Sequence, residues 1–201
     1  MIARAKAVVE RTPHDTPVDC TTPAAWERWL KRHHASAAGV WLRIAKKASG
    51  LPSIDHPEAL EVALCYGWID GQRKSEDEQH FLQRFTPRTA RSTWSKINRE
   101  KVLKLIDEGR MQPAGHAEIE RARADGRWDA AYDGVSAATV PPDLQAALDA
   151  DRKAKAFFAT LNSQNRFAIL FRTTTAKKPE TRARRIAKFV EMLAKGEKIY
   201  P

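Results

Sequence analysis

The chain has few cysteines. Only Cys20 and Cys65 occur in its 201 residues, with no CxxC pair and no other pairing framework. This argues against a small secreted scaffold held together by disulfides, and it favours reduced thiols in the cytoplasm. Cys65 lies in the apolar stretch EALEVALCYGW, where we expect a buried core thiol rather than a nucleophile.

Long apolar runs are missing as well. The most apolar segment, LEVALCYGWI, contains Glu61 and is too short to cross a bilayer. The N-terminus MIARAKAVVERTPHD carries basic residues but too short an apolar run for a signal peptide. We therefore expect a cytoplasmic protein that does not insert into a membrane.

The patterns of well-known catalytic sites are also absent. There is no GxxxxGK[ST], GxGxxG, GxSxG or HExxH pattern, and the six His residues show no spacing typical of zinc ligands. We expect neither a metal nor a cofactor. The sequence leaves open whether any reaction is catalysed.

The composition is that of a folded basic protein. Hydrophobic residues make up 42% of the chain and charged residues 30%, which excludes wholesale disorder. The formal net charge of +10 favours anionic partners, such as nucleic acid, phosphorylated metabolites or acidic protein surfaces. It also repels cationic peptides at long range, so their direct sequestration is a poor mechanism.

The hydrophobic patterns predict an α+β fold. They indicate an N-terminal arm over 1–21, an α+β domain over 22–126, a connector over 127–142 and a C-terminal helical bundle over 143–201. In the α+β domain, GVWLRIAKK alternates as a strand, and WIDGQRK and HFLQRFT, joined by SEDEQ, form a hairpin. These three strands predict a small antiparallel sheet with flanking helices, followed by the bundle.

Several strings, in order along the chain, resemble the YdeI/OmpD-associated family of bacteriocin-protection proteins. They are GVWLRIAKK, EALEVALCYGWIDG, QRFTPR, STWSKIN, GRM, AKKPETRARRI and FVEMLAKG, and the resemblance runs from about Trp26 to the C-terminus. It implies an association with protection against bacteriocins and cationic antimicrobial peptides, as part of a stress response. It brings no settled catalytic residues.

The stretch from 67 to 98 holds the main candidate site. Alternation places Trp68 and Asp70 on one side of the first hairpin strand and Arg84 on one side of the second, so Asp70 and Arg84 are expected to share a sheet face. Aromatic rings and Arg side chains there would suit a planar anion such as a nucleotide or a carboxylate, with free amides of a helix beginning near Ser92. The candidate ligand-binding residues are Trp41, Arg43, Trp68, Asp70, Arg84, Thr86, Arg88, Trp94 and Asn98.

Two other interpretations of this stretch stay open. In one of them the residues have only structural roles. Asp70 before Gly71 would set a turn, Arg84 would pair with Asp70 across the strands, and the Trp residues would pack between the sheet and the helices. Alternatively, the protein is an enzyme on a small anionic substrate with Asp70 as general acid or base. The leading hypothesis is a non-catalytic protein that holds a small anionic ligand or a protein partner, of unknown identity and in an unknown oligomeric state.

The helix near the C-terminus is a second candidate surface. Its basic residues are Lys177, Lys178, Arg182, Arg184, Arg185 and Lys188. A weak nucleic-acid interface is one interpretation, and a solvated helix face is the other, because no aromatic residues interleave the charges.

Overall fold

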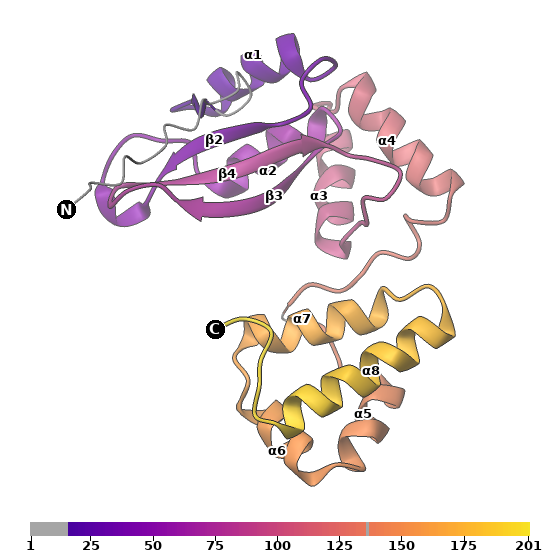
Figure 1. Cartoon of the computed structure of the whole chain (residues 1–201). Helices are drawn as coiled ribbons and strands as arrows, with labels where there is room; N and C mark the ends of the chain where they lie inside the picture. Colours follow the sequence, from indigo (N-terminus) through magenta and orange to yellow (C-terminus); the bar gives the residue numbers. More distant parts are fainter. Residues whose placement is uncertain (1–15, 136) are drawn as a thin grey trace, which may run out of the picture. The chain divides into compact units, whose positions relative to one another are not determined.

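The chain forms two compact units (Figure 1). The computed structural model describes residues 16–135 and 137–201. The first unit contains Glu100–Asp129 together with the described part of Met1–Ser92, and the second contains Thr93–Arg99 and Ala130–Pro201. One unit combines a small sheet with helices, and the other consists of helices. This arrangement confirms the predicted α+β class.

The first unit is built on a four-stranded sheet. Its strands are β1 (Val18–Asp19), β2 (Val40–Ala45), β3 (Trp68–Ser75) and β4 (His80–Pro87), in the order β1-β2-β4-β3. The hairpin of β3 and β4 and its antiparallel neighbour β2 match the prediction. The short β1, inside the predicted arm, adds a parallel edge, so the sheet is mixed.

The strand register divides the side chains between two faces. Val40 lies opposite Phe85 and Trp41 opposite Arg84, so these two pairs point to opposite sides of the sheet. The core face carries Val40, Leu42, Ile44, Phe81 and Phe85, each at most 6% exposed. The outer face carries Trp41, Arg43, Ile69, Lys74, Leu82, Arg84 and Thr86.

A β-bulge changes the alternation within β3. Asp70 pairs with Phe85 but Arg73 pairs with Gln83, so β3 has one residue more than β4 between these pairs. Gln83 is 3% exposed and its Nε2 donates hydrogen bonds to the carbonyls of Gly71 (3.1 Å) and Gln72 (3.2 Å). The bulge therefore moves Lys74 to the outer face, opposite Leu82.

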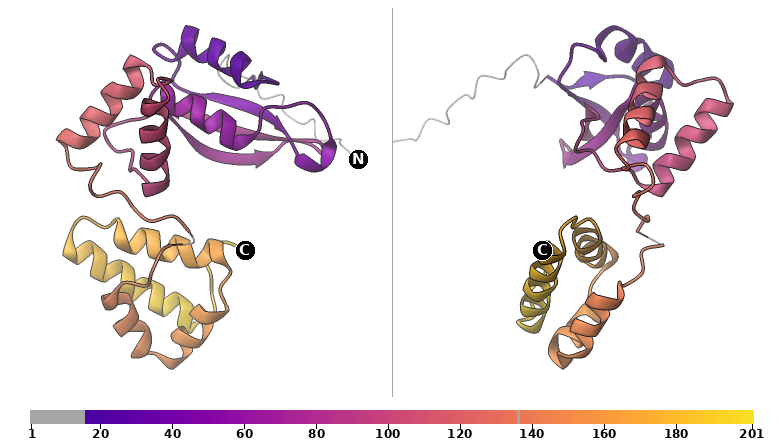
Figure 2. Two further views of the ribbon diagram at one scale, coloured as in Figure 1. Left: turned by 180° about the vertical axis from the view of Figure 1, so that it is seen from behind. Right: turned by 90° about the vertical axis from the view of Figure 1, so that its right-hand side faces the viewer.

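Two helices cover the core face. They are α1 (Pro23–His33), capped by the Thr22 hydroxyl, and α2 (His56–Cys65), which begins with a capping box of Asp55 and Glu58. The Trp26 indole of α1 donates to the Ala59 carbonyl of α2 (3.0 Å), and its ring lies 5.4 Å from that of Phe85. Figure 2 shows α2 against the sheet from behind, and in Figure 1 no described helix lies in front of β2, β4 and β3.

The next helix begins later than predicted. It was expected to be capped by Ser92 or Thr93, but α3 spans Lys96–Asp107 and the Ser95 hydroxyl accepts from the Asn98 amide (3.1 Å). The Ser92 hydroxyl instead accepts from the Thr89 amide (2.9 Å), in a turn outside the helix. The first unit is completed by the 3-10 turn η2 (Lys47–Ser49) and by α4 (Pro113–Ala124).

The second unit contains four C-terminal helices, where the sequence predicts a helical bundle. They are α5 (Pro142–Asp149), α6 (Arg152–Thr160), α7 (Ser163–Thr174) and α8 (Pro179–Ala194). Their apolar stripes meet in one core that includes Leu144, Phe158, Ile169, Phe189 and Leu193. None of the described helices is both long and apolar enough to span a bilayer.

The contact between α2 and α4 depends on a glycine. A Cβ at Gly115 would lie 2.5 Å from the Met111 methyl group and would collide with the Cys65 carbonyl oxygen. We expect Gly115→Ala to lower the free energy of unfolding of the first unit by about 1–3 kcal/mol, although alanine favours helices. Denaturant unfolding followed by Trp fluorescence measures this, because every Trp except Trp94 lies in this unit.

The neighbouring His116 provides the control. It is exposed, so His116→Ala should change the free energy of unfolding by less than about 0.5 kcal/mol. Equal stability of the Gly115→Ala protein and the unmodified protein would contradict the close approach of α4 to the end of α2.

Candidate functional site

The prediction that Asp70 and Arg84 share a sheet face is wrong. Asp70 lies opposite Phe85, on the core face, whereas Arg84 lies opposite Trp41, on the outer face. A shift of one residue in register moves a side chain to the other face of a sheet, and the sequence does not fix this register. The nine candidate residues therefore do not form a single surface.

Asp70 instead pairs with a histidine. Its carboxylate lies 3.1 Å from Nε2 of His56, and the two side chains are 29% and 32% exposed. His56 is the first residue of α2, and its ring lies roughly parallel to that of Phe85, with 6.4 Å between the ring centres. The packing of α2 on the core face brings His56 to Asp70, and a sequence separation of 14 residues gives no local sign of this contact.

Two other candidates are structural residues of the first unit. Trp68 is buried, its indole donates to the His34 carbonyl (3.2 Å), and it packs edge-on against Trp29. Arg88 is 4% exposed, and its backbone amide donates to the Gly67 carbonyl (2.9 Å). Trp68 therefore points to the core face, and Arg88 is buried just beyond the end of β4.

Arg88 also contributes to a charged cluster around Glu118. Burial raises the pKa of the Glu118 carboxyl, whereas Arg121, Arg127 and Arg88 nearby act in the opposite direction. Arg121 bonds to Glu118 and donates to the Arg88 carbonyl (3.2 Å), and Arg127 donates to the Ser92 carbonyl (2.8 Å). This cluster fixes the segment that follows β4.

Trp94 and Asn98 belong to the second unit. Trp94 is buried and precedes α3, so Trp94 and Asn98 do not lie four positions apart on one helix, as the helix expected to begin near Ser92 would place them. The expectation of free helix amides near Ser92 is also wrong, because α3 begins at Lys96. We therefore confine the candidate site to the outer face of the first unit.

The outer face brings two cations to one indole ring. The Lys74 ammonium lies 4.3 Å and the Arg84 guanidinium 5.6 Å from the centre of the Trp41 ring. No acidic partner of Lys74 or Arg84 occurs among the described residues. Lys74 was not among the residues predicted from the sequence, and the bulge in β3 is what places it on the same face as Trp41 and Arg84 while Asp70 lies on the other.

Gly39 makes room for this arrangement. Its φ of +148° is one that favours glycine, and a Cβ would lie 2.8 Å from both the Arg84 Nη2 and the Thr86 Cγ2. Arg84 and Thr86 thus lie side by side over the start of β2. The Arg84 guanidinium is held between this backbone and the Trp41 ring.

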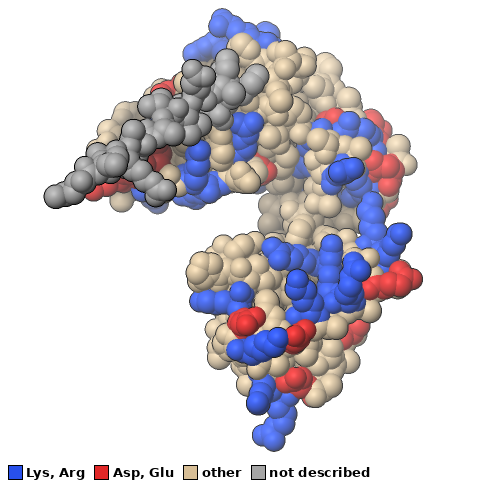
Figure 3. Space-filling view, viewed as in Figure 1, with Lys and Arg blue, Asp and Glu red and all other residues tan. Residues whose placement is uncertain are grey.

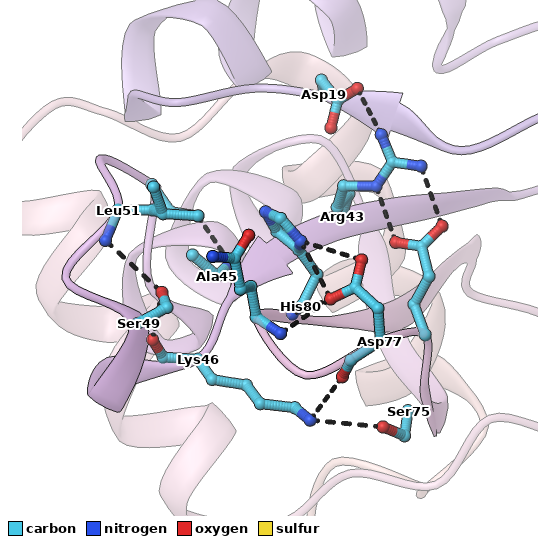
Figure 4. A network of polar contacts seen from close by, with 12 residues as sticks. Asp19, Arg43, Ala45, Lys46, Ser49, Leu51, Ser75, Asp77 and His80 are labelled. Atoms are coloured by element: carbon cyan, nitrogen blue, oxygen red, sulfur yellow. Dashed lines mark hydrogen bonds and ion pairs between the residues drawn. The ribbon is translucent and has the colours of Figure 1, made fainter.

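Arg43 is neutralised by acidic neighbours (Figure 4). It donates to Glu76 in two hydrogen bonds (2.6 and 2.8 Å) and to Asp19 in one (2.7 Å). The hydrogen bond from Arg43 lowers the pKa of the Glu76 carboxyl. In the same network, Lys46 donates to the Asp77 carbonyl (2.6 Å). Arg43 therefore links β1, β2 and the acidic connector rather than offering a free charge.

The basic residues near α8 fall into two groups. Arg182 pairs with Asp143 (2.5 Å) and donates to the Thr173 carbonyl (3.0 Å), and Arg185 donates to the Arg172 carbonyl (2.5 Å). These two side chains hold α8 against the end of α7 and the start of α5. The others, Lys177, Lys178, Arg184 and Lys188, are exposed and form no ion pair within 4.0 Å in the described part of the chain, although Lys188 adds to the charges that lower the pKa of Glu191. Figure 3 shows Lys and Arg gathered over this region of the second unit.

These features define an α+β protein with a basic, aromatic outer sheet face and a separate helical unit. The chain belongs to the family whose shared region, matched over residues 18–118, is described as a domain of unknown function (DUF8412). Residues 137–196 match the family described as "Bacteriocin-protection, YdeI or OmpD-Associated", which confirms the family predicted from the sequence. No curated protein and no solved structure matches the chain significantly.

The two matches divide the predicted resemblance. The C-terminal strings AKKPETRARRI and FVEMLAKG lie inside the bacteriocin-protection match, whereas GVWLRIAKK, EALEVALCYGWIDG, QRFTPR, STWSKIN and GRM lie inside the match to the domain of unknown function. The candidate sheet face thus belongs to the part of the chain whose family has no described function.

Arg182 provides a test of the structural role of the basic helix. The hydrogen bond from Arg182 lowers the pKa of Asp143 to about 2, so the ion pair stabilises the folded state above about pH 4 and is lost as the pH falls toward 2. Both side chains are partly exposed. We therefore expect Arg182→Gln to cost only about 1 kcal/mol at pH 7, and less at pH 2.5.

Thermal unfolding of the second unit at the two pH values, followed by circular dichroism, checks this expectation. Arg184→Gln is the matched control, because Arg184 is an exposed cation on the same helix without an acidic partner among the described residues. Equal losses of stability in the two variants at pH 7 would refute a structural role for Arg182.

Proposed function

We propose that the protein is a non-catalytic binding protein that holds a planar anion on the outer face of its sheet. The observation that supports this proposal is the placement of Lys74 and Arg84 against the Trp41 ring, without an acid to neutralise either cation among the described residues. Arg43, on the same face, is by contrast fully engaged by Asp19 and Glu76.

The chemistry of the three side chains defines the class of ligand. A guanidinium and an ammonium attract phosphate or carboxylate oxygens in charge-assisted hydrogen bonds. An indole ring binds a flat ring by stacking, which contributes about 1–3 kcal/mol for a nucleobase. Lys74 is exposed, so its side chain can leave the Trp41 ring to an incoming base and still reach the phosphate. A mononucleotide or an aromatic carboxylate combines both features.

The family match supports a role associated with bacteriocin protection. We propose that this role is exercised in the cytoplasm and is indirect, with the bound anion or a protein partner as the link to a stress response. The reduced state of Cys20 and Cys65 is compatible with that compartment. The net charge of +10 supports an indirect role, because it opposes capture of cationic peptides.

A titration with adenosine monophosphate tests the binding site. We expect saturable binding that quenches Trp fluorescence, and we expect Trp41→Ala and Arg84→Gln each to weaken it about fivefold or more, since each removes about 1 kcal/mol or more. Calorimetry gives the affinities. Arg73→Gln is the matched control, because Arg73 is an exposed cation of the neighbouring strand β3 on the core face, over the Phe81 ring.

The control should bind like the unmodified protein. Asp70→Asn should also leave nucleotide binding unchanged, because Asp70 is on the opposite face of the sheet. Unchanged binding by the Trp41→Ala and Arg84→Gln proteins, or no binding of the nucleotide at all, would refute the proposed site.

The pairing of Asp70 with His56 favours an enzyme as the second candidate. A carboxylate that orients an imidazole at 3.1 Å is an arrangement that general acid–base catalysis uses, and both side chains are partly accessible. In that case Asp70→Asn would abolish turnover while the binding of a neutral substrate analogue would survive. The other alternative from the sequence is weak nucleic-acid binding. It would rely on Lys177, Lys178, Arg184 and Lys188, because Arg182 and Arg185 are engaged within the fold.

The indirect role predicts weak contact with cationic peptides. At physiological salt, where charges are screened over about 8 Å, we expect no saturable binding of a cationic antimicrobial peptide at micromolar concentrations. Calorimetry measures this, with an anionic peptide of the same length as the reference. Tight binding of the cationic peptide would instead point to the acidic connector around Glu76 and support direct sequestration.

A further inference from the structure

The second unit contains a groove that the proposed function does not use. It has a volume of about 490 Å³ and runs along one side of α7. The opposite wall is formed by Val135 and Tyr200, which come from far apart in the sequence. The residues of α7 that line it are Ser163, Gln164, Phe167, Ala168, Phe171 and Arg172.

A buried asparagine fixes the far wall of this groove. Asn165 is 1% exposed, and its side chain receives a hydrogen bond from the Tyr200 amide (2.9 Å) and donates one to the Tyr200 carbonyl (3.2 Å). Asn162, the N-cap of α7, accepts a further hydrogen bond from the Asn165 amide group (3.1 Å). Tyr200 is thus held against α7 by polar groups that are all satisfied, so the groove has two defined walls.

The floor of the groove is aromatic. The rings of Phe167 and Phe171 stack at 5.9 Å, and Tyr132 packs edge-on against Phe171 at 4.8 Å. Val135 is 53% exposed and Tyr200 38%, which leaves apolar surface open at the rim. A second hollow of about 190 Å³ lies against the same two Phe residues. Apolar surface gathered in a concave site is typical of small-molecule binding.

Charge is confined to one end of the groove. Arg172 is its only charged lining residue and has no acidic partner in the part of the chain that the structure describes. The Arg185 guanidinium donates to the Arg172 carbonyl, which adds positive charge at this end. Ser163 and Gln164, at the other end, are neutral. Ser163 and Arg172 are nine positions apart, a distance of about 13 Å along the helix.

We propose that this groove binds an elongated apolar molecule with one anionic head group, of the class of medium-chain carboxylic acids. The carboxylate pairs with Arg172, and the chain lies over Phe171, Phe167 and Ala168 toward Ser163. A chain of roughly ten carbon atoms, with bonds of about 1.5 Å, matches the length of the groove. Each methylene removed from water contributes about 0.8 kcal/mol, so the apolar wall supplies most of the affinity.

Titration of the full chain with decanoate, below the concentration at which it forms micelles, tests this inference independently of the nucleotide site. We expect saturable one-to-one binding, with amide shifts in nuclear magnetic resonance spectra confined to α7, Val135 and Tyr200. Decanol, which has the same chain without the charge, should bind about fivefold or more weakly, because a hydrogen bond between charged groups contributes more than 1 kcal/mol.

Two Arg variants separate the site from general charge attraction. Arg172→Gln should reduce decanoate binding to the level of decanol, whereas Arg184→Gln, an exposed cation of α8 that does not line the groove, should leave it unchanged. Circular dichroism verifies that both variants are folded. No saturable binding, shifts located elsewhere, or equal decanoate affinity of the Arg172→Gln and unmodified proteins would overturn the inference.

Discussion

The register of the β3–β4 hairpin is the constraint on which the first unit depends. One extra residue in β3, held by the buried amide of Gln83, sets which side chains face the helices and which face outward. It places Asp70 beside His56 on the core face, and it turns Lys74 to the outer face beside Trp41. Without the bulge, Lys74 would lie on the face that α1 and α2 cover, and the Trp41 ring would have only Arg84 as a cation.

Charge in both units divides into residues that build the fold and residues that remain free. Arg43 and Arg182 are each bound by carboxylates, and they connect elements far apart in the sequence. Arg43 lowers the pKa of Glu76, and Arg182 lowers that of Asp143. Arg84 and Arg172 have no such acids among the described residues, and each lies beside aromatic rings. The net charge of +10 is therefore not spread evenly over the surface. The free cations that adjoin rings are the ones suited to anionic ligands.

The sequence predicts the elements better than their partners. The alternation in β2 and the caps formed by Thr22 and Asp55 each involve only a few consecutive residues, so the strand and the two helix starts can be predicted from local pattern. The pairing of Asp70 with Phe85, the contact of His56 with Asp70 and the wall formed by Tyr200 depend on residues distant in sequence. The face of Asp70 was mispredicted for this reason. Trp41 and Arg84 lie on one face because β2 and β4 pair without a bulge.

The central claim is that the sheet has one face for the core and one for an anion. The indole N–H resonances of Trp41 and Trp68 report on the two faces separately, because Trp41 is on the outer face and Trp68 is buried on the core face. During a nucleotide titration, nuclear magnetic resonance spectra should show a saturable shift of the Trp41 indole signal and no shift of the Trp68 signal. A shift of the Trp68 signal together with those of His56, and an unchanged Trp41 signal, would place the ligand on the core face and contradict this division.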